Sequence, residues 1–210
     1  MTVIERISYY QNIRNEKPNQ QLAKDLAEDQ DTAGITEIAA HIRDKNASIR
    51  SDCLKVLYEI GYLEPHLITP YVNDFLSLLE SKQNRMVWGG MIALSTIADI
   101  VPEKIWMEKN KVINAIRKGS VITTITGVKV LSALAAHDRA YSDALFPILI
   151  TILETCIPRD VPTHAESMLG SINVNNKAMV LDLLKAREEE LSKSQMTRLR
   201  RVIQKIQEIN

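Results

Sequence analysis

A hydrophobic pattern typical of a helix recurs along the chain at a nearly constant interval, and this spacing constrains the fold more than any other feature. The corresponding positions are Leu54, Ile92, Leu131 and Leu169, separated by 38, 39 and 38 residues, with a fainter copy near Ile203 after a further 34. Periods of this size are typical of stacked helical hairpins, in which one unit alone has too little apolar surface to fold. The sequence therefore predicts a surface built by repetition, without indicating what binds to it.

The composition fits such a helical protein. Of the 210 residues, 45% are hydrophobic and 25% are charged, which is ordinary for a soluble protein with a substantial core. The 26 basic residues balance the 26 acidic residues, whereas proteins that bind DNA or RNA backbones usually carry a net basic face. We therefore expect nucleic-acid binding to be weak or absent.

The cysteines and the apolar segments predict a cytoplasmic protein without membrane association. Cys53 and Cys156 are too few for a disulfide framework and lie among apolar helical neighbours, which predicts buried free thiols in a reducing compartment. The first residues lack the apolar region of a signal peptide. The longest apolar run, around Leu145 to Leu153, contains Pro147 and is too short to span a bilayer.

Apolar residues at three- and four-residue spacing predict about five helical pairs over residues 32–207. Two N-terminal helices within residues 1–31 are expected to cap the first open face of the stack, one from Val3 to Arg14 and one from Gln20 to Asp29. No linker or low-complexity tract interrupts the pattern, so residues 1–210 are expected to form a single domain.

Helix ends carry their own signals. Gly61 is expected to terminate the second helix of the first pair. Thr69 and Pro70 are expected to open the next pair, with threonine as the capping residue and proline in the first turn. The segment Pro158–Pro162 is expected to separate the two helices of the fourth pair.

One segment resembles the HEAT repeat of the armadillo-type α-solenoids. It reads Asp44-Lys45-Asn46-Ala47-Ser48-Ile49-Arg50, followed by Cys53-Leu54, Leu57 and Ile60-Gly61. In that family an aspartate in the turn between paired helices precedes an aliphatic–arginine step that opens the second helix. The pair is complete only in the first repeat, because the position of Arg50 is taken in later repeats by Trp88, Gly127, Ala165 and Leu199.

The resemblance implies an all-α, right-handed α-solenoid (superhelix) of stacked antiparallel helix pairs whose second helices line the concave side. Most members of the family are protein-binding scaffolds. We therefore expect a non-catalytic interaction module that binds a partner protein or peptide on its concave surface, without a cofactor. A subunit that self-associates into a homo-oligomer through an uncapped end overlaps with this expectation.

The alternative from another class is a HEAT-like DNA glycosylase or another nucleic-acid-binding protein. The glycosylase resemblance demands a catalytic aspartate and aromatic residues in a basic groove, yet the helix bearing Trp88 has no acid before Asp99. Motifs for other chemistry are missing from the sequence, which contains no HExxH, no phosphate-binding glycine loop and no paired Cys-His spacing. The expectation is therefore no metal site and no enzyme.

The most unusual local feature is Trp88 followed by Gly89 and Gly90 inside a helix, since each interior glycine costs about 1 kcal/mol relative to alanine. One interpretation is that a neighbouring helix approaches closely and Trp88 fills a gap between repeats. The other is that the glycines open the concave surface and Trp88 anchors a partner there.

Alignment of the second helices extends this candidate groove. The aligned positions in the middle of the supposed concave face hold small, weakly polar residues, which suits a partner helix or peptide. The aligned positions could equally contact the next repeat. They are Ser51, Lys55 and Tyr58; Gly89, Ala93 and Thr96; Val128, Ser132 and Ala135; and Glu166 and Gly170. The candidate binding residues are Trp88, Gly89, Gly90, Lys55, Tyr58 and Glu166, with Glu166 as the only carboxylate well inside the trough.

The C-terminal segment holds the only charge cluster of the sequence. Its cations are Lys193, Arg198, Arg200, Arg201 and Lys205, against the single acid Glu208. A solvated last helix accounts for such a cluster, and the preceding Glu188-Glu189-Glu190 could neutralise it across the hairpin. Contact with nucleic acid is the minority interpretation.

Overall fold

The computed structural model describes residues 2–209, and every regular element within that range is helical. The expectation of an all-α fold is therefore confirmed. The internal contacts divide the chain into two compact units, Met1–Thr126 and Gly127–Asn210, and the boundary falls inside helix α8 (Val121–His137). In neither unit does a helix of the described residues combine the length and apolar character needed to cross a membrane.

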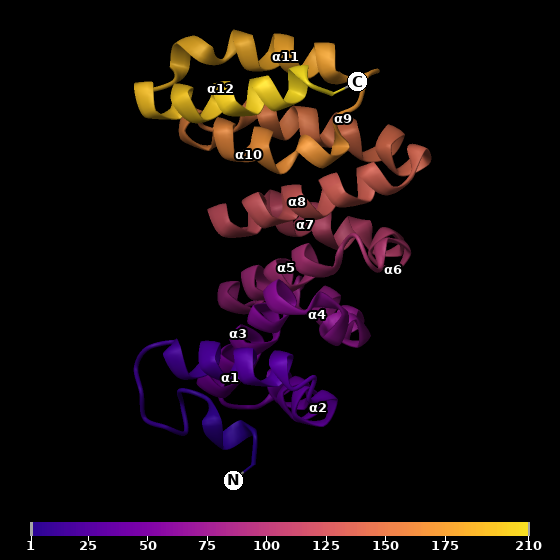
Figure 1. The fold of residues 1–210 in the computed structure, drawn as a ribbon. Coiled ribbons are helices and arrows are strands. Elements are labelled where there is room, and N and C mark those ends of the chain that lie inside the picture. The colour runs from indigo at the N-terminus through magenta and orange to yellow at the C-terminus, as the bar shows by residue number, and fades with distance from the viewer. Residues whose placement is uncertain (1, 210) are drawn as a thin grey trace. The chain divides into compact units, whose positions relative to one another are not determined.

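In the first unit, helices pack in sequential pairs (Figure 1). Before α8, its α-helices are α1 (Lys17–Glu28), α2 (Thr32–Ala40), α3 (Ala47–Leu63), α4 (Val72–Leu78), α5 (Asn84–Ile97), α6 (Pro102–Met107) and α7 (Lys109–Lys118). Helix α2 pairs with α3 and α4 pairs with α5, and α3 lies between α1 and α5. Two second helices, α3 and α5, are therefore in direct contact.

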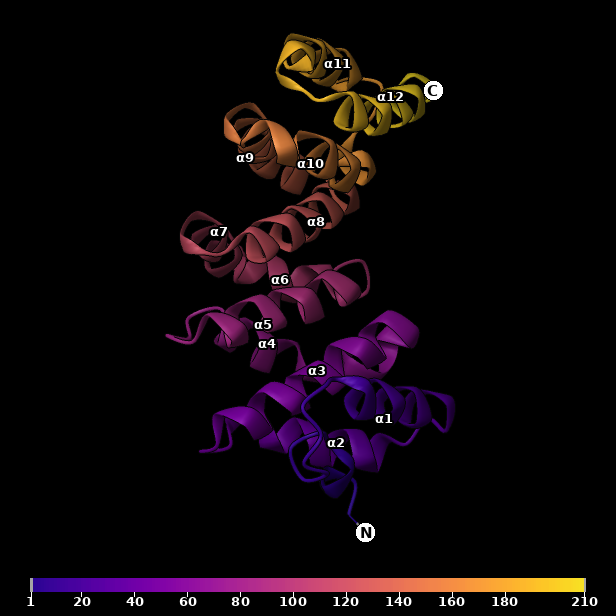
Figure 2. The same cartoon turned by 90° about the vertical axis from the view of Figure 1, so that its left-hand side faces the viewer.

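The second unit repeats the arrangement. Beyond α8 its α-helices are α9 (Arg139–Thr155), α10 (Val161–Ser167), α11 (Lys177–Ala186) and α12 (Lys193–Gln207). Helix α10 packs against α9 on one side and α12 on the other, and α11 packs on α12, as Figure 2 shows from the side. The predicted break at Pro158–Pro162 is present as a 3₁₀ turn, Pro158–Asp160, ahead of α10.

The repeated apolar positions form the core in three of four cases. Leu54, Ile92 and Leu131 are buried, as predicted. The prediction is wrong for Leu169, which is only half-buried. Helix α10 ends at Ser167, and Leu169 opens a separate 3₁₀ turn, so the helical face that would bury it is not continued.

The predicted helix from Val3 to Arg14 does not form. Only Ile4–Arg6 makes a 3₁₀ turn, and Asn12 has a φ of 54°. The backbone N–H of Ser8 donates to the buried side chain of Asn19 at 2.8 Å, and that of Tyr9 donates to Asp52 at 2.9 Å. Because side chains distant in sequence satisfy these amides, the segment does not need the helical hydrogen bonds that its local pattern favours.

The Thr69-Pro70 signal also misplaces a helix start. Both residues lie inside a longer 3₁₀ segment, Pro65–Tyr71, and α4 begins only at Val72. The hydroxyl of Thr69 donates to the carbonyl of His66 at 2.9 Å, so it does not accept from the first turn of α4 as a capping residue would.

Arg50 makes the contacts expected of a structural residue, to its own turn and to the next repeat. Arg50 donates to the backbone carbonyl of Asp44 and to that of Lys45, the latter at 3.0 Å. Its guanidinium also donates to the Gln83 side chain at 2.8 Å, at the start of α5. The arginine therefore reaches back to its own turn and across to the next repeat. Its contact with Asp44 is to the backbone carbonyl, because the Asp44 carboxylate accepts from the N–H of Asn46 at 2.8 Å.

Replacing Arg50 with alanine should lower the free energy of unfolding by about 1–2 kcal/mol, since a partly exposed guanidinium loses three hydrogen bonds at once. Urea denaturation followed by circular dichroism measures this. The control is Arg43→Ala, which removes a 68% exposed side chain paired with Asp74 and should cost no more than about 0.5 kcal/mol. Unchanged stability of Arg50→Ala together with loss of partner binding would instead make Arg50 a recognition residue.

Candidate functional site

Three of the residues singled out in the sequence lie together in the first unit. Lys55 and Tyr58 are one helical turn apart on α3, and Trp88 lies on the adjacent α5, with its ring centroid 6.2 Å from that of Tyr58. The spacing of one repeat places Trp88 beside α3 because α3 and α5 pack directly on each other. We call the group Tyr58, Tyr62 and Trp88 the aromatic cluster.

The aromatic cluster reaches the surface at its edge. Tyr58 is buried and Trp88 is half-buried, whereas Tyr62 is 58% exposed and meets Tyr58 edge to face, with centroids 6.4 Å apart. Burial raises the pKa of Tyr58 and of Tyr62 above the usual tyrosine value. Both phenols are therefore neutral near pH 7, and the exposed part of the cluster is the neutral ring of Tyr62.

A buried lysine, Lys55, contacts the aromatic cluster through the ring of Tyr58. The Nζ atom of Lys55 lies 2.6 Å from a carboxylate oxygen of Glu59 and 3.0 Å from one of Glu16. Burial on its own lowers the pKa of Lys55, but the hydrogen bonds to Glu59 and Glu16 outweigh it and hold the pKa above its ordinary value. The ammonium also sits 4.9 Å from the centroid of the Tyr58 ring, so its charge is shared between two carboxylates and an aromatic face.

Arg85 is a second cation beside the aromatic cluster. Its guanidinium lies 5.5 Å from the centroid of Trp88 and donates to Glu16 at 3.0 Å. Burial raises the pKa of Glu16, but the hydrogen bond and charge of Lys55 and the charge of Arg85 overcome it, and the net pKa is lowered. Both carboxylates beside the aromatic cluster, Glu16 and Glu59, are thus engaged in ion pairs and are not arranged as a free general base.

The glycine pair is explained by helix packing. A Cβ atom at Gly89 would lie 2.5 Å from Cδ2 of Leu54, and one at Gly90 would lie 3.0 Å from both Cβ of Leu78 and the carbonyl oxygen of Phe75. Gly89 therefore admits α3, and Gly90 admits α4. Both glycines are buried, so the interpretation that a neighbouring helix approaches closely describes them, and neither opens onto a surface.

The remaining candidate, Glu166, lies in the second unit on α10, and its side chain is 46% exposed. Its carboxylate accepts from two nitrogens of Arg198 on α12, and Arg198 also donates to the hydroxyl of Thr163 at 2.8 Å. The hydrogen bond from Arg198 lowers the pKa of Glu166. This carboxylate is therefore ionised and paired.

Most other aligned trough positions are buried. Ala93, Val128, Ser132 and Ala135 are buried, and a Cβ at Gly61 would meet Thr96 at 2.3 Å. A continuous trough of small residues is therefore not presented to solvent along these helices. For Thr96 on α5, the close approach to Gly61 on α3 is the contact with the adjoining repeat that the sequence left open.

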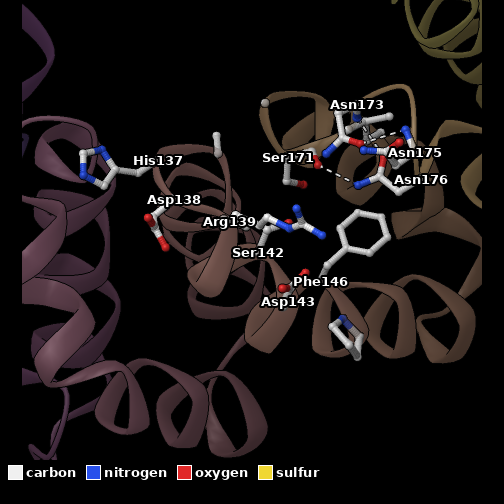
Figure 3. Close-up of a pocket in the computed structure, with 15 residues that line it drawn as sticks. His137, Asp138, Arg139, Ser142, Asp143, Phe146, Ser171, Asn173, Asn175 and Asn176 are labelled. Atoms are coloured by element: carbon white, nitrogen blue, oxygen red, sulfur yellow. Dashed lines mark hydrogen bonds between the residues drawn. The ribbon is translucent and has the colours of Figure 1, made fainter.

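A hollow that the sequence did not indicate lies in the second unit between the start of α9 and the loop before α11. Its volume is about 820 Å³. Figure 3 shows Arg139 extending toward Phe146, with the side chains of the Asn173–Asn176 loop grouped nearby. Asp138 accepts from the N–H of Ala140 at 2.7 Å as the cap of α9, so this carboxylate is occupied by the fold itself.

The residues described hold no group of three or more side chains suited to a metal ion. Burial raises the pKa of the Cys53 thiol far above its ordinary value, which makes Cys53 an inert core residue, as expected. The aromatic cluster is therefore the strongest candidate surface, and its geometry suits non-covalent recognition.

Comparisons with known proteins agree on the fold. No family model matches the chain, and no curated protein sequence is significantly similar to it. Among solved structures, an engineered protein from the Northeast Structural Genomics Consortium superposes with a TM-score of 0.65 at 14% identity, covering 99% of this chain and 97% of that one. A second engineered protein from the consortium gives 0.61 at 16% identity, covering 98% and 99%.

A designed armadillo repeat protein gives a TM-score of 0.60 at 10% identity, covering 97% of this chain and 98% of that one. Identities this low establish the fold alone. The chain is thus an all-α helical-repeat protein of the armadillo type, a fold class to which the HEAT resemblance of residues 44–61 also points.

Proposed function

We propose that the chain is a non-catalytic protein-interaction module that binds a partner protein or peptide across the exposed edge of the aromatic cluster. The observation that carries the proposal is the joining of Tyr62, Tyr58 and Trp88 into one packed group whose edge residue is 58% exposed. Aromatic side chains held rigidly at a surface are the residues that most often contribute the affinity of an interface.

The setting of the cluster supports recognition without chemistry. Lys55 and Arg85 hold the rings by cation–π contacts and are themselves fixed by Glu16. A rigid, already ordered surface costs less conformational entropy on binding. The armadillo-type fold is consistent with this role because stacked helices display extended surfaces for partners.

Replacing Tyr62 with alanine should abolish capture of a partner while leaving the free energy of unfolding within about 0.5 kcal/mol of the wild type, because most of the ring is exposed. Trp88→Ala should also abolish capture and should lower stability by about 1–2 kcal/mol, less than the loss for a fully buried tryptophan. Quantitative affinity purification from cell extract, with a thermal melt of each variant, measures both effects.

The matched control is Tyr10→Ala, which removes a tyrosine of similar exposure, 46%, outside the cluster. Partners that bind through the aromatic cluster are retained by this variant and lost by Tyr62→Ala and Trp88→Ala. The proposal fails if all three variants recover the same proteins as the wild type. A loss of melting temperature of core size for Trp88→Ala, with capture intact, would place Trp88 in the core instead.

A further inference from the structure

A second surface with different chemistry lies in the second unit, along α12. It is a groove of about 610 Å³ that we call the α12 groove. Its lining residues are Glu166, Ser194, Thr197, Arg198, Arg201, Val202 and Lys205. Arg198, Arg201 and Lys205 recur at spacings of three and four, so one face of α12 directs three cations into the groove.

The groove carries an unbalanced positive charge. Glu166 is its only carboxylate and is already paired with Arg198. Within the described residues, neither Arg201 nor Lys205 lies within ion-pair distance of an acidic side chain. The hydrogen bond and charge of Arg198, followed by the charges of Lys205 and Lys129, lower the pKa of Glu166.

The acidic run before α12 does not neutralise these cations. Both carboxylate oxygens of Glu190 accept from Arg187 at 2.8–2.9 Å, and Arg187 is directed to the end of α9. The sequence-based expectation that Glu188-Glu189-Glu190 balances the last helix is therefore wrong for Glu190. Arg201 keeps a planar guanidinium free to bind a carboxylate through two parallel hydrogen bonds.

We propose that the α12 groove binds an acidic segment of a protein partner, with its carboxylates on Arg201 and Lys205. Charge complementarity selects the sign of the ligand. Ser194 lines the same groove with a hydroxyl group, and the Thr197 hydroxyl, which donates to the carbonyl of Lys193 at 2.9 Å, can accept a hydrogen bond from a peptide N–H. The lining contains no aromatic side chain on which bases could stack, and three cations fall short of the phosphate contacts of a typical nucleic-acid site. A protein carboxylate therefore fits the groove better than a nucleic acid.

This surface is additional to the aromatic cluster, which lies in the first unit, and neither proposal depends on the other. The test is fluorescence anisotropy of the full chain with a fluorescein-labelled peptide of alternating Glu and Ser, at low and at physiological salt. Binding is expected to weaken with salt, and the same peptide with Gln in place of Glu is expected not to bind.

The variants compare neighbouring cations on one helix. Arg201→Gln and Lys205→Gln should each weaken binding about fivefold, the equivalent of about 1 kcal/mol for a partly exposed charge pair. Arg200→Gln removes the same charge from an exposed position outside the groove and should leave affinity unchanged. All three positions are at the surface of α12, and a melt of each variant checks that the fold is retained.

Three results would overturn the proposal. Equal weakening by Arg200→Gln and Arg201→Gln would mean attraction to net charge without a site. Tighter binding of a single-stranded oligonucleotide than of the Glu peptide would assign the groove to nucleic acid. Lack of peptide binding by the wild type would show that the α12 groove is not such a site. That result would leave the proposal for the aromatic cluster untouched, because it is tested by partner capture with Tyr62→Ala. Trp88→Ala is expected to bind the peptide like the wild type.

Discussion

Replacing Arg187 with alanine is expected to lower the free energy of unfolding by about 3 kcal/mol. Arg187 is 8% exposed and follows the end of α11. Its guanidinium donates to three carbonyls at the end of α9, those of Leu153, Glu154 and Cys156, at 2.8, 2.6 and 2.8 Å. Removing it takes the guanidinium donor away from all three carbonyls, of which that of Leu153 keeps only the weak Cys156 thiol, and leaves Glu190 without its cation.

Urea denaturation gives the stability of the variant, and hydrogen exchange should show faster exchange at the end of α9 than in the wild type. Arg187→Lys should recover only part of the loss, because an ammonium cannot span three carbonyls as a planar fork does. Arg159→Ala is the control, since this arginine is 66% exposed and pairs with Asp160. Equal losses for Arg159→Ala and Arg187→Ala would contradict the stabilising role of the hydrogen bonds from Arg187 to the end of α9.

Gly89→Leu should lower the free energy of unfolding by about 3 kcal/mol through overpacking between α3 and α5. Even a single added carbon would lie 2.5 Å from Cδ2 of Leu54 and 3.0 Å from its Cγ, and Leu54 is fully buried. The loss should appear in a urea melt although leucine is a better helix former than glycine.

A double variant tests whether overpacking against Leu54 causes the loss of stability. In Gly89→Leu/Leu54→Ala the new side chain gains the space that Leu54 leaves, so the combined loss should be smaller than the sum of the two single losses. Gly170→Ala serves as a control because the nearest atom to its added Cβ is the Ser132 hydroxyl at 3.8 Å, and it should be close to neutral. Additive losses in the double variant would show that Gly89 is needed for another reason.

The repeat architecture could be predicted from the sequence because its signal is local. Amphipathic spacing around Leu54, Ile92 and Leu131 depends on each helix burying one face, and that face survives in the structure. The failures are at positions where distant residues decide. Asp52 and Asn19 hold the backbone of Tyr9 and Ser8 away from a helix, and no local pattern contains that information.

The candidate site was predictable for the same reason and to the same limit. Lys55, Tyr58 and Trp88 meet because α3 and α5, the second helices of adjoining repeats, pack directly on each other. The solvent exposure of each residue could not be predicted, because it depends on which side chains of neighbouring helices cover it. Gly89 is filled by Leu54, and Glu166 is paired by Arg198, which lies 32 residues further along the chain.

Glu16 gives the aromatic cluster a border of an unusual kind. This residue closes the irregular segment before α1 and bonds to Lys55 on α3 and Arg85 on α5. The three aromatic residues belong to packed helices, whereas Glu16 belongs to an irregular segment that is tied to α3 by this carboxylate and by the hydrogen bond from the N–H of Tyr9 to Asp52. Because the same carboxylate pairs with Lys55 beside Tyr58 and with Arg85 beside Trp88, a change at Glu16 alters the support of both rings at once.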